Sequence, residues 1–292
     1  MTIQGRIIKG IGGFYYIQPS GSDQIFECRA RGRFRKDGIT PLVGDVVKCN
    51  IDPASNTGLI SEILPRTNSL IRPPVANVSR IAIVFSVVNP RPNLHTVDKL
   101  ITSAMYAGIR PIICINKTDL QSGSELFDIY SGAGFDTLCV SAENGENIDK
   151  LEEMLIGELT VFAGNSGVGK SSILNRILKH ADLETGEVSG RVERGRHTTR
   201  HSELMPLDSG DGYIIDTPGF SSFTVSDMDE KQLCELFPEF EPYLTGCEFS
   251  DCSHTVERGC AVLEALKNGK ISESRHESYK AQYKEISDNK EY

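Results

Sequence analysis

The sequence predicts a multidomain α/β protein with a β-barrel in residues 1–68, an α/β domain in residues 69–225 and a helical domain in residues 226–292. Three changes of pattern along the 292 residues indicate this division. Short β-rich segments separated by turn residues fill the first part, and long apolar segments alternate with helical ones in the second. The third part combines closely spaced cysteines and a histidine with two helical stretches. A chain of this length has room for two or more domains.

Five short segments of the first part are rich in β-branched and aromatic residues and are bounded by Gly, Pro, Asn or Asp, as strands are. They cover residues 5–10, 14–17, 24–30, 45–49 and 58–63. Five short strands favour a small closed barrel of the OB type, which commonly binds oligonucleotides. Residues 65–74, which begin and end with proline, are the expected linker to the next domain.

A cluster of basic residues interleaved with Phe34 lies between two of these strand segments. Its members are Arg29, Arg31, Arg33, Arg35 and Lys36. Such a surface can follow a nucleic-acid backbone while an aromatic ring stacks on a base. The alternative is a solvated basic loop on a barrel that has only a structural role.

Charge is distributed unevenly, because the net charge of the chain is −9 whereas residues 1–68 carry +3. The negative total argues against attraction of the whole molecule to nucleic acid or membrane, so a nucleic-acid contact is expected at the N-terminal end. No apolar run approaches the ~20 residues of a membrane span, and the N-terminus lacks the pattern of a signal peptide. We therefore expect a cytoplasmic protein whose cysteines are metal ligands or core residues rather than disulfides.

From residue 79 the pattern alternates between strands and helices. Continuous apolar runs predict buried parallel strands over residues 81–88, 111–115 and 137–140, with a helix over 94–106. The second strand is followed by Asn116-Lys117-Thr118-Asp119, and the third by Ser141-Ala142-Glu143. Open α/β sheets bind ligands at the C-terminal ends of their parallel strands, so both motifs are expected at a ligand site.

A phosphate-binding loop is predicted between an apolar strand at residues 159–163 and a helix that follows it. Its residues are Gly164, Asn165, Ser166, Gly167, Val168, Gly169, Lys170, Ser171 and Ser172, which match G-x-x-x-x-G-K-[ST]. The glycines allow backbone N–H groups to turn towards phosphate oxygens at a helix N-terminus. Lys170 is expected to reach the β- and γ-phosphates, and Ser171 to hold Mg²⁺.

The N-K-x-D and S-A-x motifs resemble the guanine-reading elements of the GTPase superfamily. The carboxylate of Asp119 can accept hydrogen bonds from the ring N–H and the amino group of guanine, whereas adenine presents an acceptor there. Asn116 is expected to fix the strand end, and Lys117 to lie against the base. Ser141 and Ala142 would close over the base. If N-K-x-D were a chance match, an ATP-using enzyme would remain as the alternative.

The motifs occur in an unusual order. Ordinary GTPases carry the phosphate loop first and the guanine-reading elements last, but here the guanine-reading elements precede the loop. The sequence therefore predicts a circularly permuted P-loop GTPase with the motif order G4, G5, G1, G2, G3. A helix over residues 148–156 can return the chain from the base pocket to the phosphate-loop strand without disturbing the sheet.

Two segments after the loop are expected to sense the γ-phosphate. In the polar segment 190–199, Thr198 or Thr199 is placed to give Mg²⁺ a second hydroxyl, and we prefer Thr199. A strand over residues 212–215 then delivers Asp216-Thr217-Pro218-Gly219, which resembles the D-x-x-G element. In that element Asp216 would lie near Mg²⁺ through a water molecule, and the Gly219 N–H would contact the γ-phosphate.

Phe220 stands where many GTPases carry the glutamine that positions the attacking water. Because a phenyl ring cannot orient water, intrinsic hydrolysis is expected to be slow, with His197 as the nearest candidate for a catalytic group. The alternative for His197 is a surface histidine without a catalytic part. The corresponding alternative for the whole protein is a nucleotide-bound scaffold that never turns over GTP.

Cys247, Cys252, His254 and Cys260 place three thiols and an imidazole within fourteen residues. Cys₃His is a structural Zn²⁺ set, and its four ligands leave no open position for catalysis. One Zn²⁺ is therefore expected as a folding staple, with free thiols as the alternative. The remaining cysteines are scattered and are not expected to be ligands: Cys28, Cys49, Cys114, Cys139 and Cys234. Helices are expected over residues 261–267 and 272–287.

A barrel, a permuted GTPase and a Cys₃His domain in this order resemble the small ribosomal subunit biogenesis GTPase family, of the RsgA, YjeQ and YloQ type, over essentially the whole chain. The family also carries a segment like Gly195-Arg196-His197-Thr198-Thr199 and a hydrophobic residue where Phe220 stands. The resemblance implies GTP hydrolysis stimulated by the small (30S) ribosomal subunit during its late maturation, with contacts to 16S rRNA. We expect a monomer without a membrane partner, in which Lys170, His197 and Thr199 carry catalysis.

Overall fold

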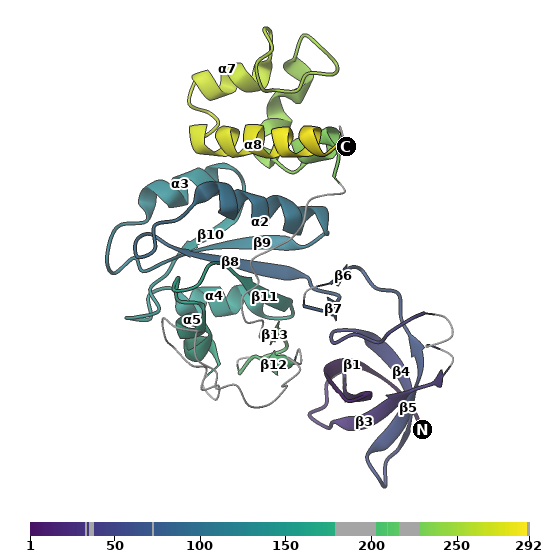
Figure 1. Cartoon of the computed structure of the whole chain (residues 1–292). Coiled ribbons are helices and arrows are strands. Elements are labelled where there is room, and N and C mark those ends of the chain that lie inside the picture. Colours follow the sequence, from purple (N-terminus) through teal and green to yellow (C-terminus); the bar gives the residue numbers. More distant parts are fainter. Residues whose placement is uncertain are drawn as a thin grey trace, which may run out of the picture. The chain divides into compact units, whose positions relative to one another are not determined.

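The computed structural model describes residues 1–32, 34, 38–71, 73–178, 203–208, 210–215 and 228–290. Several predicted site residues lie outside these ranges: Arg33, Arg35, Lys36, His197, Thr198, Thr199, Asp216, Gly219 and Phe220. The order of strands and helices makes the chain a multidomain α/β protein, as predicted (Figure 1).

The N-terminal part is a closed barrel of the OB type, which confirms the prediction. Its strands are β1 (Thr2–Ile11), β2 (Phe14–Pro19), β3 (Phe26–Ala30), β4 (Val46–Asp52) and β5 (Thr57–Ile63), in the order β1-β2-β3-β5-β4. The neighbouring strands are antiparallel, except that β3 and β5 run parallel. Ile7, Ile17 and Ile60 are fully buried and contribute to the barrel core, as alternation along a half-buried strand requires.

The aromatic residue expected to stack on a base is not available for that role. Phe34 is only 5% exposed, so its ring belongs to the core and the prediction for it was wrong. Phe14 offers a ring instead. The guanidinium of Arg29 lies over the Phe14 ring with 4.4 Å between Cζ and the ring centroid, and the two residues are register partners on β2 and β3.

The segment expected as a linker, residues 65–74, is tied to the barrel. It contains β6 (Ser69–Leu70), which pairs with β7 (Val75–Ala76). Arg66 makes a bidentate ion pair with the buried Asp45, at 2.7 and 2.8 Å, and the amide nitrogen of Asn77 donates to the Gly44 carbonyl at 3.1 Å. These bonds attach the connection to the barrel, and we call residues 65–79 the bracket segment.

The central part contains one six-stranded sheet in the order β10-β9-β8-β11-β13-β12. The strands are β8 (Arg80–Ser86), β9 (Arg110–Asn116), β10 (Asp136–Cys139), β11 (Leu159–Ala163), β12 (Leu204–Pro206) and β13 (Tyr213–Ile215). β12 and β13 run antiparallel, whereas β9 and β10 run parallel, as do β11 and β13. Figure 1 shows α2 (Leu94–Tyr106) and α3 (Ser124–Gly132) on one face of β8, β9 and β10, with α5 (Lys170–Ile177) on the other. α4 (Ile148–Leu155) is the predicted return helix.

By its internal contacts the chain forms two compact units, and neither is a single stretch of sequence. The first unit joins residues 1–80 to residues 153–162 and to the described residues of the range 188–220. The second unit joins residues 81–152 to the phosphate-loop region and to the C-terminal domain. The barrel thus shares a unit with β12 and β13, while both guanine motifs share a unit with the cysteine-rich domain.

The C-terminal domain is helical and has a small aromatic core. It consists of α6 (Glu230–Glu235), the 3₁₀ helix η1 (Pro238–Gly246), α7 (Ala261–Lys267) and α8 (Glu273–Lys290). Phe237, Phe240 and Tyr279 are buried, and the Tyr279 ring meets the two phenyl rings edge-on at 5.1 and 5.0 Å between centroids. No helix in the described part of the chain has both the length and the apolar character needed to cross a membrane.

A buried arginine fastens α8 to α2. Arg275 is fully buried and donates to Asp98 Oδ1 at 2.6 Å and to Glu239 Oε1 at 2.7 Å. Its guanidinium also lies 4.5 Å from the centroid of the Phe237 ring. Burial alone would lower the pKa of Arg275, but the two carboxylates outweigh it and raise that pKa above its ordinary value. The arginine therefore stays charged, and removal of α8 would leave the carboxylates of Asp98 and Glu239 without their cationic partner.

Candidate functional site

The phosphate loop has the backbone that its glycines were expected to provide. Gly164, Gly167 and Gly169 have φ angles of 140°, 78° and 96°, which only glycine adopts easily. A Cβ at Gly164 would collide with the carbonyl oxygen of Val84, and a Cβ at Gly169 would collide with the side chain of Asn116. Larger residues are therefore excluded by conformation and by space.

Lys170 begins α5 and turns back into the loop. Its Nζ donates to the carbonyl oxygens of Gly164 and Asn165, both at 2.7 Å. Burial lowers the pKa of Lys170. Burial disfavours the charged form of this ammonium. A phosphate group held by the loop N–H groups would stabilise the charged form, because it places a negative charge nearby. The geometry therefore fits the predicted phosphate-binding role.

Asn116 joins the two guanine motifs to the phosphate loop. It is 1% exposed, its amide nitrogen donates to the Val168 carbonyl at 2.8 Å, and its amide oxygen accepts from the Ala142 N–H at 3.1 Å. Three segments that are distant in sequence thus meet at one side chain. A circular permutation can keep this meeting point, because it changes the order of the segments and leaves their places in the sheet unchanged.

Asp119, the residue predicted to read guanine, is oriented by a hydrogen bond from Ser141. The buried hydroxyl of Ser141 donates to Asp119 Oδ1 at 2.6 Å, while Asp119 itself is exposed. The carboxylate therefore faces outward with a fixed orientation and keeps acceptor capacity for a base. Lys117 has a left-handed backbone, with φ of 65°, and its ammonium donates to the Asn89 carbonyl, beside the loop that precedes α2.

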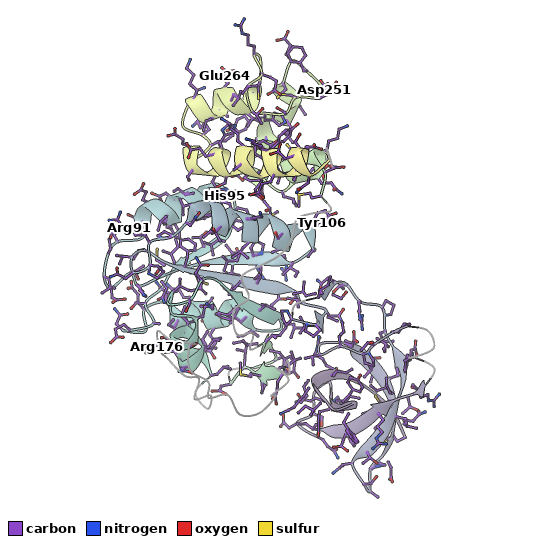
Figure 2. All side chains as sticks on the ribbon, in the orientation of Figure 1. Arg91, His95, Tyr106, Arg176, Asp251 and Glu264 are labelled. Atoms are coloured by element: carbon purple, nitrogen blue, oxygen red, sulfur yellow. The ribbon has the colours of Figure 1, made fainter. Side chains whose placement is uncertain are left out.

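Sequence reasoning missed Arg176, an exposed residue near the end of α5 (Figure 2). Its guanidinium donates from Nε to the Ala142 carbonyl and from Nη2 to the Glu143 carbonyl. It therefore fastens the S-A-x loop to the helix that follows the phosphate loop. An arginine on an exposed helix face is common, so nothing in the sequence distinguished it.

We predict that Arg176→Gln raises the KM for GTP and the Kd for GDP by roughly 10-fold, the effect of losing one to two hydrogen bonds from a charged group. The turnover number should stay unchanged, because Arg176 holds the base loop and does not touch the phosphates. Titration with a fluorescent guanine nucleotide measures the affinity.

Arg176→Lys is the matched control, since it keeps the charge and one donor and should lose less affinity. Equal affinities for all three proteins would show that the S-A-x loop keeps its place without Arg176.

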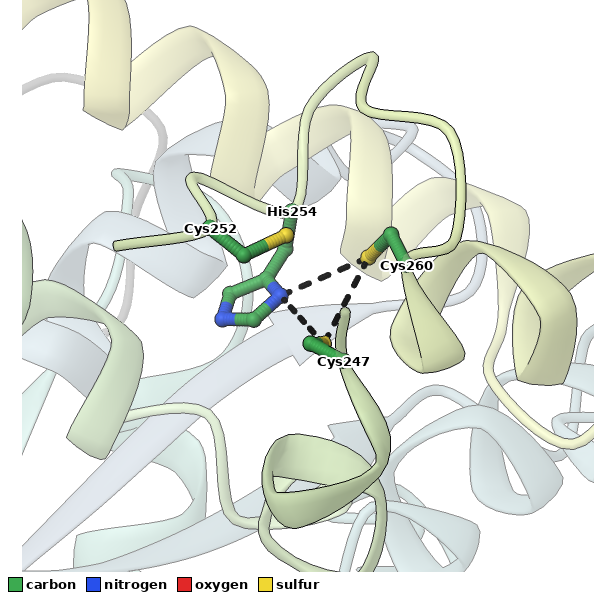
Figure 3. Close-up of side chains that lie close together, drawn as sticks. All are labelled: Cys247, Cys252, His254 and Cys260. Carbon is green, nitrogen blue, oxygen red and sulfur yellow. Dashed lines mark hydrogen bonds between the residues drawn. The ribbon is translucent and has the colours of Figure 1, made fainter. Parts of the chain in front are cut away.

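The predicted zinc ligands come together in the C-terminal domain. The ligand atoms of Cys247, Cys252, His254 and Cys260 all lie within 4.8 Å of one another (Figure 3). His254 Nδ1 is 3.6 Å from Cys247 Sγ and 3.4 Å from Cys260 Sγ, and these two sulfurs are 4.0 Å apart. Tetrahedral Zn²⁺ with ordinary bond lengths needs roughly 3.6 Å between nitrogen and sulfur and roughly 3.8 Å between sulfurs. The four residues therefore fit a closed, structural zinc site.

Hydrogen bonds around the cluster hold its loop in place. The carboxylate of Glu257 accepts from the hydroxyl of Ser253 and from N–H groups of residues 253, 255 and 256. Burial alone would raise the pKa of Glu257, but these hydrogen bonds lower it to about 2. His276 Nε2 donates to the His254 carbonyl at 2.8 Å, and Tyr279 donates to the Ser253 carbonyl at 2.8 Å. The aromatic core is thus bonded directly to the metal-binding loop.

Within the residues that the structure describes, this is the one group of His, Cys, Asp or Glu side chains placed to hold a metal ion. The other cysteines, Cys28, Cys49, Cys114, Cys139 and Cys234, are free thiols outside it. Ser171 and Ser172 occupy the first turn of α5, as expected of a Mg²⁺-binding loop. The remaining predicted catalytic and magnesium residues, His197, Thr199, Asp216 and Gly219, lie outside the described residues and stay predictions.

Two family models match the chain and together span most of it. The RsgA N-terminal domain matches residues 4–60, which form the barrel, and the RsgA GTPase matches residues 63–226. The boundary between these matches falls beside the bracket segment.

Similar proteins cover nearly the whole chain. The small ribosomal subunit biogenesis GTPase RsgA of Ruminiclostridium cellulolyticum is 47% identical over 291 residues, which are 99% of this chain and 95% of that protein. The protein of the same name from Alkaliphilus metalliredigens is 43% identical and covers 99% of both chains.

Two solved structures are also similar throughout. YjeQ from Thermotoga maritima has a TM-score of 0.84 at 33% identity and covers 98% of this chain and 99% of its own. YloQ, described as a circularly permuted GTPase, has a TM-score of 0.83 at 35% identity, with 99% and 96% covered.

Proposed function

Because the chain belongs to the RsgA GTPase family, we propose that it hydrolyses GTP under stimulation by the small (30S) ribosomal subunit, late in the maturation of that subunit. The chain is a GTPase, as its family is. The observation that carries the nucleotide part of the proposal is the meeting of the phosphate loop and both guanine motifs at the buried Asn116. The names of the relatives support the part that concerns the small subunit. A phosphate loop supplies nucleotide binding, and guanine-reading elements restrict that binding to GTP and GDP.

In this proposal the described residues bind and orient the nucleotide. The N–H groups of residues 164–172 and the Lys170 ammonium hold the β- and γ-phosphates, and Ser171 holds Mg²⁺. Bound Mg²⁺ would neutralise charge that develops on the phosphates during transfer to water. Asp119 selects guanine, with Thr118 in the motif and Ser141 and Ala142 closing the pocket.

The catalytic step is assigned to residues that follow the phosphate loop. Thr199 would supply a second hydroxyl to Mg²⁺, Asp216 would lie near the metal through a water molecule, and the Gly219 N–H would contact the γ-phosphate. His197 positions the attacking water, since Phe220 cannot. Slow intrinsic turnover is expected from this assignment, because the glutamine that positions water in many GTPases is replaced by Phe220.

The barrel is proposed to contact 16S rRNA. Arg29 is exposed and stacked on Phe14, and the neighbouring Arg31 is also exposed. A guanidinium on an aromatic ring presents a flat cationic surface that suits both bases and phosphates. The positive charge of residues 1–68 favours the same contact, and the Cys₃His site with Zn²⁺ keeps the C-terminal domain folded.

Hydrolysis assays with purified small subunits, large subunits and neither test the proposal. We expect phosphate release to rise with small subunits alone. Equal rates in all three reactions would contradict stimulation by the small subunit, and no hydrolysis in any of them would favour the scaffold alternative.

We predict that His197→Ala lowers stimulated turnover by roughly 10²-fold, the low end of the effect of a positioned acid or base group. Nucleotide affinity should change little, because His197 replaces no phosphate-contacting group. His201→Ala, four residues further along the chain, is the matched control and should keep full turnover. Equal turnover of the His197→Ala variant and the unmodified protein would make His197 a bystander.

A further inference from the structure

The antiparallel pair β12 and β13 connects the two segments proposed to sense GTP. β12 begins at Leu204, five residues after Thr199, and β13 ends at Ile215, directly before Asp216. The two strands are in register from Leu204 with Ile215 to Pro206 with Tyr213. The strand pair therefore follows the first of these segments in the chain and directly precedes the second.

The barrel contacts this strand pair through Tyr213. The Tyr213 hydroxyl donates to Gln18 Oε1 at 3.0 Å, and the guanidinium of Arg6 lies 6.0 Å from the centroid of the tyrosine ring. Arg6 and Gln18 are register partners on β1 and β2, so both reach Tyr213 from the same face of the barrel. Burial raises the pKa of Tyr213, so its hydroxyl keeps the proton that it donates.

A second contact joins the barrel to the residue before β12. Lys9 of β1 and Glu203 form an antiparallel backbone bridge, and their side chains make an ion pair of 2.7 Å. The side chains are 31% and 48% exposed, so the ion pair contributes at most about 1 kcal/mol to stability. The backbone bridge places β12 beside a barrel strand, and the ion pair strengthens that contact.

The bracket segment is hydrogen-bonded to β11, the sheet strand beside β13, at its last residue. Ser79 N donates to the Leu159 carbonyl at 3.0 Å, and Leu159 N donates to the Ser79 hydroxyl at 2.9 Å. Leu159 is in turn the register partner of Tyr213 in the parallel pair of β11 and β13. At Gly44 of the barrel, a Cβ would collide with the Ala76 carbonyl, so the backbones touch there.

We propose that the barrel acts as a lever on β12 and β13, so that a nucleic-acid partner bound to the barrel places the GTP-sensing segments for hydrolysis through Tyr213, Gln18, Lys9 and Glu203. The inference rests on the proposed function, since it assumes stimulation by the small subunit. In this proposal the four residues are positioning residues, which act through β12 and β13 and not by contact with nucleotide or partner. One compact unit contains the barrel together with β11, β12 and β13, and the guanine motifs belong to the other unit. This division is the structural basis of the lever.

The test compares Tyr213→Phe, which removes only the hydroxyl, and Glu203→Lys, which opposes Lys9, with the unmodified chain. Basal turnover, GDP affinity and affinity for small subunits should each stay within twofold. Turnover at saturating small subunits should fall about 5-fold for each variant, the effect of one lost hydrogen bond or ion pair on the stimulated state. The double variant Lys9→Glu with Glu203→Lys restores the ion pair and should recover the stimulated rate.

Glu62→Lys is the matched control. Glu62 pairs with Lys48 at 2.9 Å on the barrel surface, and their side chains are 50% and 44% exposed, so the same charge reversal occurs away from β12. This variant should keep full stimulation.

Unchanged stimulated turnover in Tyr213→Phe and Glu203→Lys would overturn the lever. So would a loss confined to subunit affinity, because these residues would then belong to a docking surface. If the unmodified protein is not stimulated by small subunits, the proposed function fails first and the lever with it.

Discussion

Asp119→Asn is expected to weaken GTP binding by about 10²-fold or more and to make xanthosine triphosphate the preferred nucleotide. The asparagine amide can accept only one of the two hydrogen bonds that guanine donates, and its NH₂ group opposes the guanine amino group, where a hydrogen bond to a charged acceptor is worth about 1.5–3 kcal/mol. This amide presents one donor and one acceptor, which match the ring N–H and the added carbonyl of xanthine. Competition of GTP, ATP and xanthosine triphosphate for the variant measures the change.

The substitution should change the base-reading group without moving the loop that carries Ser141. An asparagine oxygen can still accept from the Ser141 hydroxyl, which donates to Asp119 Oδ1 at 2.6 Å, so the loop should keep its place. Asp128→Asn, at an exposed position on α3, is the matched control and should leave nucleotide choice unchanged. Unchanged GTP affinity in Asp119→Asn would rule out Asp119 as the guanine reader.

Local patterns explain why much of the fold could be predicted from sequence. α2 has the predicted bounds because Asn93 caps it, accepting from the Thr96 N–H at 3.1 Å, and Gly108 follows its end with φ of 71°. The phosphate loop and the strands around it were predictable for the same reason. Their glycines and apolar runs satisfy backbone and burial requirements that depend only on nearby residues.

Contacts between distant residues could not be predicted in this way. Arg275 and Asp98 are 177 residues apart, and nothing in either neighbourhood signals a buried ion pair. The same holds for Arg176, whose partners are backbone carbonyls and therefore leave no mark in the sequence. α3 was missed because its short amphipathic segment has one fully buried residue, Tyr130. Phe34 was misassigned because a ring among basic residues gives no sign of which way it points.

Cys252→Ser is expected to lose the bound metal and to unfold the C-terminal domain. Metal binding contributes on the order of 10 kcal/mol to the folding of small zinc domains at neutral pH, and a core as small as this one cannot replace it. α8 would then leave α2, and Asp98 would lose its partner Arg275. Nucleotide affinity should survive, because no described residue of the nucleotide site contacts the metal loop. Zinc analysis, protease resistance and nucleotide titration measure these effects.

Cys234→Ser is the matched control, because it distinguishes the loss of a metal ligand from the loss of side-chain packing. Cys234 lies in the same domain, half-buried and outside the cluster, and burial raises its pKa to about 11, so a neutral thiol is replaced by a neutral hydroxyl. That variant should keep one zinc ion per chain and a protease-resistant domain. Loss of zinc in both variants would point to a general loss of packing. A Cys252→Ser protein that keeps its zinc, or a native metal-free preparation that stays folded, would refute the assigned ligand set.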